Sequence, residues 1–149
     1  MQKPEDLYID LLKNTLSFSL WPEPPVPLGM FGRRRNALGR KLAQGVNRVL
    51  SSRGLMLAEV PGYTEAQRTG GEVWPGYADT MVGRHRLDNI EHCIRQAIAD
   101  GVPGDFIETG VWRGGSCILM RGVLKAPGVT DRRVTVAHGS QVLPRPHLA

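Results

Sequence analysis

The second half of the chain alternates between short apolar runs and an amphipathic segment, and this pattern constrains the fold more than any other feature. It predicts a short buried strand from Phe106 to about Thr109, a helix over residues 114–126 and a second strand over residues 133–137. Pro127-Gly128 stops the helix between the two strands. A strand, a crossover helix and a further strand form the building block of parallel α/β sheets. The sequence therefore predicts an α/β fold.

The remaining segments divide the chain into three predicted parts. Residues 1–21 contain a helix from Glu5 to Leu16, which carries one apolar stripe. Residues 22–75 hold a proline-rich linker, a basic amphipathic helix and a stretch from Pro61 onward that is typical of a loop. Residues 76–149 begin with a further helix, which Asp79 or Thr80 can cap and which runs to Asp100; the α/β unit follows.

The excess of positive charge is confined to the middle part. The chain has 19 Lys and Arg against 14 Asp and Glu, and seven of these bases lie in residues 33–53 without any acid between Glu23 and Glu59. Apolar residues recur there at helical spacing: Leu38, Leu42, Val46, Val49 and Leu50. Such a helix can lie on anionic lipid or bind nucleic acid. We favour a surface helix docked by its apolar stripe with its arginines in water. No DNA partner is expected, because residues 33–62 contain no aromatic side chain for stacking on bases.

The most informative loop joins the first predicted strand to the following helix. The strand ends in Glu108, Gly110 follows, and Gly114 and Gly115 open the helix. Ligands of open α/β sheets bind at the carboxyl ends of strands, and the free amides of a helix start favour an anionic group. The glycine spacing matches neither the dinucleotide fingerprint nor a P-loop. A carboxylate here suits an ammonium group, as in S-adenosylmethionine; the alternative is an ordinary tight turn.

Two longer stretches carry a family resemblance. Residues 78–90 (ADTMVGRHRLDNI) and residues 100–115 (DGVPGDFIETGVWRGG) are similar to the sequences of macrocin O-methyltransferases, and residues 6–13 and 120–132 are similar as well. The resemblance implies a partial Rossmann-like S-adenosylmethionine methyltransferase fold preceded by N-terminal helices. It also implies a methyltransferase that acts on a sugar hydroxyl of a macrolide or glycolipid-type natural product. The resemblance further implies that Mg²⁺ assists in the complete family enzyme, with ligands that we do not find in this sequence.

The resemblance also assigns a cofactor site by position, although it identifies no catalytic residue. The residues that it implies around S-adenosylmethionine are Thr80, Met81, Glu108, Thr109, Gly110, Val111 and Trp112. The physical argument from the loop also supports a ligand-binding role for Glu108 and Gly110. Thr80 could equally be a helix cap, Met81 a core residue and Trp112 an anchor of the loop.

The sequence departs from the family after the second predicted strand. The family continues Val-Ala-Asp-Ser-Phe-Glu-Gly-Leu-Pro, whereas residues 136–144 read VAHGSQVLP. The aspartate would accept hydrogen bonds from the ribose hydroxyls, while His138 offers at most one ring acceptor, so cofactor affinity should fall. The metal-binding aspartates and the catalytic base would lie beyond Ala149. We therefore expect a truncated copy that transfers no methyl group alone; the alternative is an inactive methyltransferase remnant or a binding module with a basic surface helix.

The remaining expectations concern surroundings and partners. No run of about 18 apolar residues could span a bilayer, and the N-terminus lacks the apolar core of a signal peptide, so a cytoplasmic protein is expected. Cys93 and Cys117 should then be reduced. Cys117 follows a helix start that could lower its pKa, although we favour buried packing. The expected partner is a small-molecule glycoside, and family members tend to form homo-oligomers.

Overall fold

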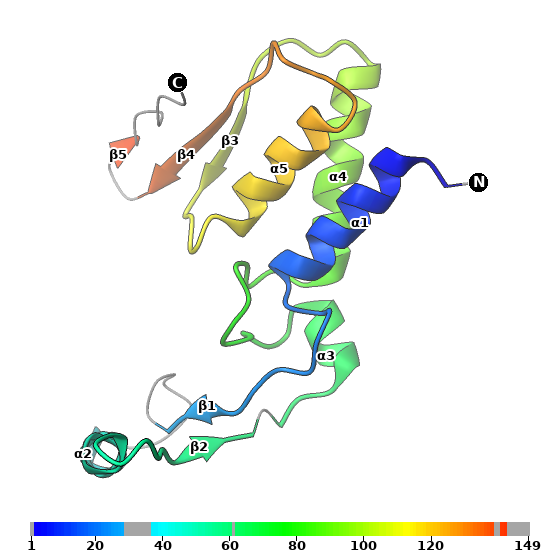
Figure 1. Ribbon diagram of the computed structural model, residues 1–149. Coiled ribbons are helices and arrows are strands. Elements are labelled where there is room, and N and C mark those ends of the chain that lie inside the picture. The colour runs from blue at the N-terminus through cyan, green and yellow to red at the C-terminus, as the bar shows by residue number, and fades with distance from the viewer. Residues whose placement is uncertain (1, 29–36, 61, 139–140, 143–149) are drawn as a thin grey trace. The chain divides into compact units, whose positions relative to one another are not determined.

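The computed structural model describes residues 2–28, 37–60, 62–138 and 141–142 and forms two compact units (Figure 1). Residues 22–63 make up one unit, and the segments before and after it form the other. This division differs from the predicted domains. The first helix belongs to the same unit as the α/β part, and the boundary follows Tyr63 rather than Pro75.

The larger unit is built on a small sheet of order β3-β4-β5. Strand β3 (Phe106–Thr109) pairs in parallel with β4 (Val134–His138), with Phe106 opposite Val134 and Thr109 opposite Ala137. Helix α5 (Gly115–Lys125) connects them, which confirms the predicted β–α–β unit. Strand β5 (Gln141–Val142), which the sequence did not predict, adds an antiparallel partner to β4.

Helices lie on one side of this sheet (Figure 1). They are α1 (Pro4–Leu16), α4 (Arg84–Ala99) and α5, and their apolar faces form one core. The buried residues of that core are Ile9, Leu16, Leu87, Ile94, Leu119, Val123 and Leu124. Phe106 of β3 and Val134 of β4 pack against it from the sheet. The apolar spacing of α4 is thereby confirmed as core-facing, with Leu87 and Ile94 buried. The stripe predicted for α1 (Leu7, Tyr8, Leu11, Leu12 and Leu16) is wrong in part, because Leu7, Tyr8 and Leu11 are exposed and Ile9 is buried beside Leu16 instead.

Charged side chains join α1 to α4 beside this core. The Lys13 ammonium, almost fully buried, donates to Asp88 at 2.6 Å and pairs with Glu91. Arg84 Nε donates to the same Asp88 carboxylate at 2.9 Å, and its Nη2 pairs with Asp10. Burial alone would raise the pKa of Asp88, but the hydrogen bonds and charges of Lys13 and Arg84 hold it below its ordinary value.

Two predictions about the segment before α4 are wrong. The helix begins at Arg84 with Gly83 as its N-cap, not at Asp79 or Thr80. The amides of Asp79 and Thr80 instead donate to the Leu16 carbonyl at the end of α1, and both residues lie outside the helix. The predicted loop from Pro61 onward contains α3 (Glu65–Gly70), which starts with a capping box between Thr64 and Gln67.

The smaller unit contains the predicted basic helix, α2 (Ala37–Ser51), beside a short antiparallel pair, β1 (Val26–Pro27) and β2 (Ala58–Glu59). The side chain of Asn47 holds α2 to the chain before β2. Its Oδ1 accepts from the Leu57 amide at 2.7 Å, and its Nδ2 donates to the Leu57 carbonyl at 3.1 Å. Ala43 is buried on this side of the helix.

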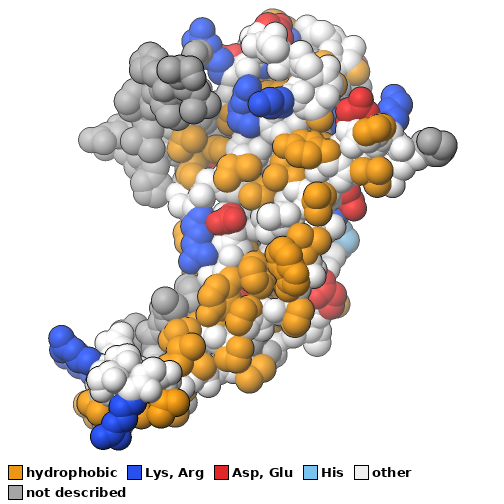
Figure 2. Space-filling view, viewed as in Figure 1, with side chains coloured by type: hydrophobic (Ala, Val, Ile, Leu, Met, Phe, Trp, Pro, Cys, Tyr) orange, Lys and Arg blue, Asp and Glu red, His pale blue; other side chains and the backbone are white. Residues whose placement is uncertain are grey.

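The apolar stripe of α2 is not docked as expected. Leu38, Leu42 and Val49 are 76%, 70% and 66% exposed, because the unit packs against the neighbouring face that carries Ala43 and Asn47. Exposed apolar side chains lie beside Lys and Arg on this part of the surface (Figure 2). Within the described ranges, no helix is both long and apolar enough to cross a bilayer.

Candidate functional site

The candidate site begins at Glu108, near the end of β3. The loop that follows, residues 110–114, contains Gly110 and Gly114 and is called the glycine loop below. The Glu108 side chain is partly buried, and Oε2 accepts a hydrogen bond from the Cys117 thiol at 2.7 Å. Burial raises the pKa of Cys117 to about 12, and the hydrogen bond and charge of Glu108 act in the same direction. The structure thus confirms buried packing for Cys117 and contradicts the lowered pKa that a helix start could give. The carboxylate keeps acceptor capacity for a further donor.

Open space surrounds the two glycines that turn the chain out of β3. Gly110 and Gly114 have φ values of +76° and +85°, which favour glycine, and a Cβ built on either would meet no atom within 4 Å. The Gly110 amide is held by the Ala137 carbonyl at 3.0 Å, so the turn starts from the sheet in a fixed position. The loop therefore presents bare backbone beside the Glu108 carboxylate, as a closely approaching ligand requires.

The segment before α4 lies directly against the start of α5. The Gly115 amide donates to the Asp79 carbonyl at 3.1 Å, and a Cβ on Gly115 would lie 2.5 Å from that oxygen and 2.8 Å from Thr80 Cβ. Thr80 is buried, and its hydroxyl accepts from the Val82 amide at 3.3 Å. Thr80 is therefore neither a helix cap nor remote from the glycine loop, although 35 residues separate it from Gly115.

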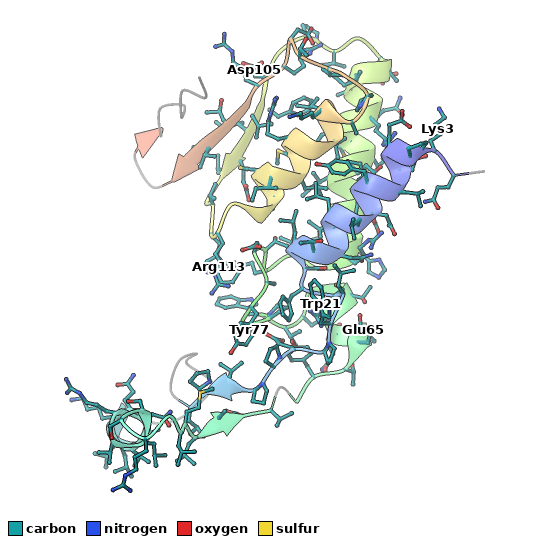
Figure 3. All side chains as sticks on the ribbon, in the orientation of Figure 1. Lys3, Trp21, Glu65, Tyr77, Asp105 and Arg113 are labelled. Atoms are coloured by element: carbon teal, nitrogen blue, oxygen red, sulfur yellow. The ribbon has the colours of Figure 1, made fainter. Side chains whose placement is uncertain are left out.

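Arg113 lies in the loop between β3 and α5 (Figure 3), directly after Trp112 in the sequence. Trp112 is 38% exposed, and the Arg113 guanidinium lies over its ring, 4.1 Å from the centroid. Arg113 Nη1 also donates to the carbonyls of Gly76 and Ala78, at 2.9 and 2.7 Å. Sequence reasoning missed Arg113, because a lone arginine in a loop carries no spacing pattern that reveals its partners.

The seven implied cofactor residues thus come from two segments that the fold brings together. Thr80 and Met81 lie in the segment before α4, and the other five lie at the end of β3 and in the loop after it. Val111 is buried, whereas Thr109 and Gly110 are exposed. The position where the family has an aspartate is His138, whose side chain lies outside the described part of the chain. No group of three or more His, Cys, Asp or Glu that could hold a metal occurs among the residues that the structure describes.

A known family matches almost the whole chain. Residues 5–149 match the Macrocin-O-methyltransferase (TylF) family. The chain belongs to this family. Among curated macrocin O-methyltransferase relatives, mycinamicin III 3''-O-methyltransferase of Micromonospora griseorubida is 38% identical over 140 residues, which are 94% of this chain and 44% of that protein. An 8-demethyl-8-(2,3-dimethoxy-alpha-L-rhamnosyl)-tetracenomycin-C 4'-O-methyltransferase of Streptomyces olivaceus is 39% identical over 93% of this chain and 42% of its own length.

A solved structure supports the fold assignment. The O-methyltransferase NovP matches with a TM-score of 0.62 and 36% identity, over 89% of this chain and 41% of that chain. The fold is accordingly a partial Rossmann-like methyltransferase fold of the macrocin O-methyltransferase family. The chain spans less than half the length of these relatives.

Proposed function

We propose that this chain forms the S-adenosylmethionine-binding part of an O-methyltransferase that acts on a sugar hydroxyl of a macrolide or glycolipid-type natural product. The observation that carries the proposal is the Glu108 carboxylate, which the sheet holds beside the open backbone of Gly110 and Gly114. The names of the relatives support a glycosylated small-molecule acceptor.

The residues fit the methionine end of the cofactor. Glu108 would accept hydrogen bonds from the methionyl ammonium, because an ionised carboxylate forms strong hydrogen bonds with charged donors. Apart from the Gly115 amide, which donates to the Asp79 carbonyl, the amides at the start of α5 would face the carboxylate of the cofactor, where the helix dipole favours negative charge. Thr80, Met81 and Trp112 would line the same site. S-adenosylmethionine, when bound, supplies an electrophilic methyl group on a sulfonium.

The remaining parts of the reaction are not assigned to residues of this chain. A base must take the acceptor hydroxyl proton, and in this proposal Mg²⁺ assists by lowering the pKa of that hydroxyl. The Rossmann-like part alone would contribute binding and orientation of the methyl donor. We therefore expect the purified 149-residue protein to bind the cofactor weakly and to methylate no sugar.

Calorimetry with S-adenosylmethionine and S-adenosylhomocysteine tests the cofactor proposal. Glu108→Gln keeps the size of the side chain but removes its charge, so the dissociation constant for either ligand should rise at least tenfold, which corresponds to about 1.4 kcal/mol. Glu65→Gln is the matched control, because Glu65 is exposed in the first turn of α3. Equal affinity of the wild type and Glu108→Gln, or no binding at millimolar ligand, refutes the proposal.

A second candidate function rests on the exposed apolar stripe of α2. We propose that Leu38, Leu42 and Val49 can enter the surface of an anionic bilayer while bases such as Lys41 and Arg48 contact the headgroups. The exposure of the stripe favours this candidate over a fully docked surface helix. Self-association through the same segment is disfavoured by seven bases without an acid between Glu23 and Glu59.

Sedimentation with vesicles tests this candidate. The wild type should bind vesicles that contain phosphatidylglycerol at low salt and not neutral vesicles, and Leu38→Ser/Leu42→Ser should remove the binding. Leu7→Ser/Leu11→Ser is the control, because these leucines are exposed on α1 of the other unit. Binding that survives the α2 substitutions, or no binding by the wild type, removes lipid contact as a function of α2.

A further inference from the structure

Arg113 is not one of the seven residues implied to bind the cofactor, yet it makes several contacts beside them. One nitrogen of its guanidinium donates both of its hydrogens, to the Gly76 carbonyl at 2.9 Å and the Ala78 carbonyl at 2.7 Å. The planar group also lies over the Trp112 ring at 4.1 Å. A residue of the loop after β3 therefore holds two backbone groups that precede it by 35 and 37 residues.

A second contact joins the same two segments on the other side of Ala78. The Gly115 amide donates to the Asp79 carbonyl at 3.1 Å, and the absence of a side chain on Gly115 permits this approach. The amides of Asp79 and Thr80 donate in turn to the Leu16 carbonyl, at 2.8 and 3.3 Å. Residues 76–80 thus lie between the end of α1 and the start of α5, attached to both.

We propose that Arg113 is a positioning residue that holds residues 76–81 against the glycine loop and so brings the two halves of the cofactor site together. We call its contacts with Gly76, Ala78 and Trp112 the clasp. Thr80 and Met81 come from the first segment, and Glu108 to Trp112 come from the second. The β3–α5 connection places the second half, whereas Thr80 and Met81 lie outside it and need a contact that joins them to the loop. This inference rests on the proposed cofactor binding, which it deepens by naming the residue that joins the halves.

The chemistry of arginine explains why this residue type suits the clasp. Its guanidinium is planar and rigid, so it can stack on Trp112 while its edge donates to two carbonyls. A lysine ammonium is a compact point charge on a flexible stem and cannot combine a flat stack with two donors in fixed directions. Removal of the guanidinium would leave the Gly76 and Ala78 carbonyls without this donor and Trp112 without its cover.

The first arm of the test measures the clasp in the chain without cofactor. Hydrogen exchange of the Gly115 amide should accelerate at least tenfold in Arg113→Ala and in Arg113→Lys, because its acceptor segment is released. The Val129 amide, which donates to the Leu124 carbonyl at the far end of α5, should stay within twofold of wild type. Arg121→Ala is the control: Arg121 is exposed on α5 and donates to the Arg132 carbonyl at 3.0 Å, away from the site.

The second arm measures S-adenosylmethionine affinity by calorimetry in the same variants. The dissociation constant should rise at least tenfold in Arg113→Ala, and about 20 mM guanidinium should restore part of the loss in that variant alone. A purely structural role would show no such rescue, and melting temperatures identify a variant that fails to fold, in which case Arg113→Lys replaces Arg113→Ala.

The two arms together separate this inference from the proposed function. Faster Gly115 exchange in a protein that binds no cofactor at all refutes the proposed function and leaves the contact of the two segments standing. Faster exchange with unchanged cofactor affinity overturns the positioning role, as does unchanged exchange with weaker binding, which would indicate direct contact with the ligand. Unchanged exchange and unchanged affinity overturn the clasp itself.

Discussion

Replacement of Gly115 by alanine should destabilise the larger unit far more than replacement of Gly122, although both glycines lie in α5. The alanine Cβ at position 115 would meet the Asp79 carbonyl oxygen at 2.5 Å, its carbon at 2.8 Å and Thr80 Cβ at 2.8 Å. These atoms belong to a segment attached to α1 through the Leu16 carbonyl, so they cannot move cheaply. At position 122 the Cβ would meet the end of the Leu12 side chain, which can change its rotamer.

The expected magnitudes follow from two opposing effects. Insertion of a methyl group into a packed site costs about 1–3 kcal/mol, and alanine is better than glycine within a helix by about 1 kcal/mol. At Gly122 these effects nearly cancel, so the free energy of unfolding should stay within about 1 kcal/mol of wild type. At Gly115, the first residue of α5, the helix gain is smaller and the clash involves backbone, so a loss of about 2 kcal/mol is expected.

Urea unfolding followed by circular dichroism measures both variants. With a slope of about 2 kcal/mol per molar urea, Gly115→Ala should lower the midpoint by about 1 M. Gly122→Ala should move it by less than about 0.5 M. A Gly115→Ala midpoint equal to that of wild type would show that residues 76–80 do not lie against α5. A larger loss at Gly122 than at Gly115 would refute the distinction between backbone and side-chain neighbours.

Three further expectations concern titration, reactivity and helix propensity. Because the pKa of Asp88 is lowered in the folded state, its contribution to stability is present above its unfolded pKa of about 4 and is lost as the pH falls through its folded pKa. Urea midpoints measured at pH values under about 4 should therefore be lower than at neutral pH, and this decrease should be smaller in Asp88→Asn. Iodoacetamide at pH 8 should alkylate the exposed Cys93 and spare Cys117, which with a pKa of about 12 is ionised in roughly one molecule in ten thousand; equal labelling by mass spectrometry would contradict the burial of Cys117. Gly45→Ala should increase the helicity of α2 by circular dichroism, since a Cβ there meets nothing within 4 Å and alanine gains about 1 kcal/mol; unchanged or lower helicity would count against the helix.

The elements that the sequence predicted best are those with a strong period and a clear stop. Helix α5 ends before Pro127 as predicted, and short apolar runs identified both β3 and β4, although β3 is only half-buried and Ile107 is exposed rather than buried as predicted. The start of α4 was missed because Asp79 is a good cap by type, while long-range hydrogen bonds to Leu16 decide its conformation. Local propensity cannot report a contact with a residue more than 60 positions away.

Local sequence also fails to predict which face of the basic helix, α2, is buried. Its period predicted a helix correctly, but an apolar stripe does not say which neighbour covers it. Asn47 decides the orientation of α2 within its unit, through hydrogen bonds to Leu57, and so leaves Leu42 in solvent. The two hydrogen bonds of this polar side chain, and not the apolar stripe, thus accompany the packed face of the helix.

The candidate site divides in the same way between local and long-range information. Glu108 and Gly110 could be predicted because a strand end, a carboxylate and a glycine turn are all local in sequence, and their geometry needs only the β3–α5 connection. Thr80 entered the prediction through family resemblance alone, since its place depends on contacts made by Arg113 and Gly115. Arg113 and Gly115 thus hold the part of the site that local patterns cannot predict. Substitutions of these two residues should therefore displace Thr80 more than they displace Glu108.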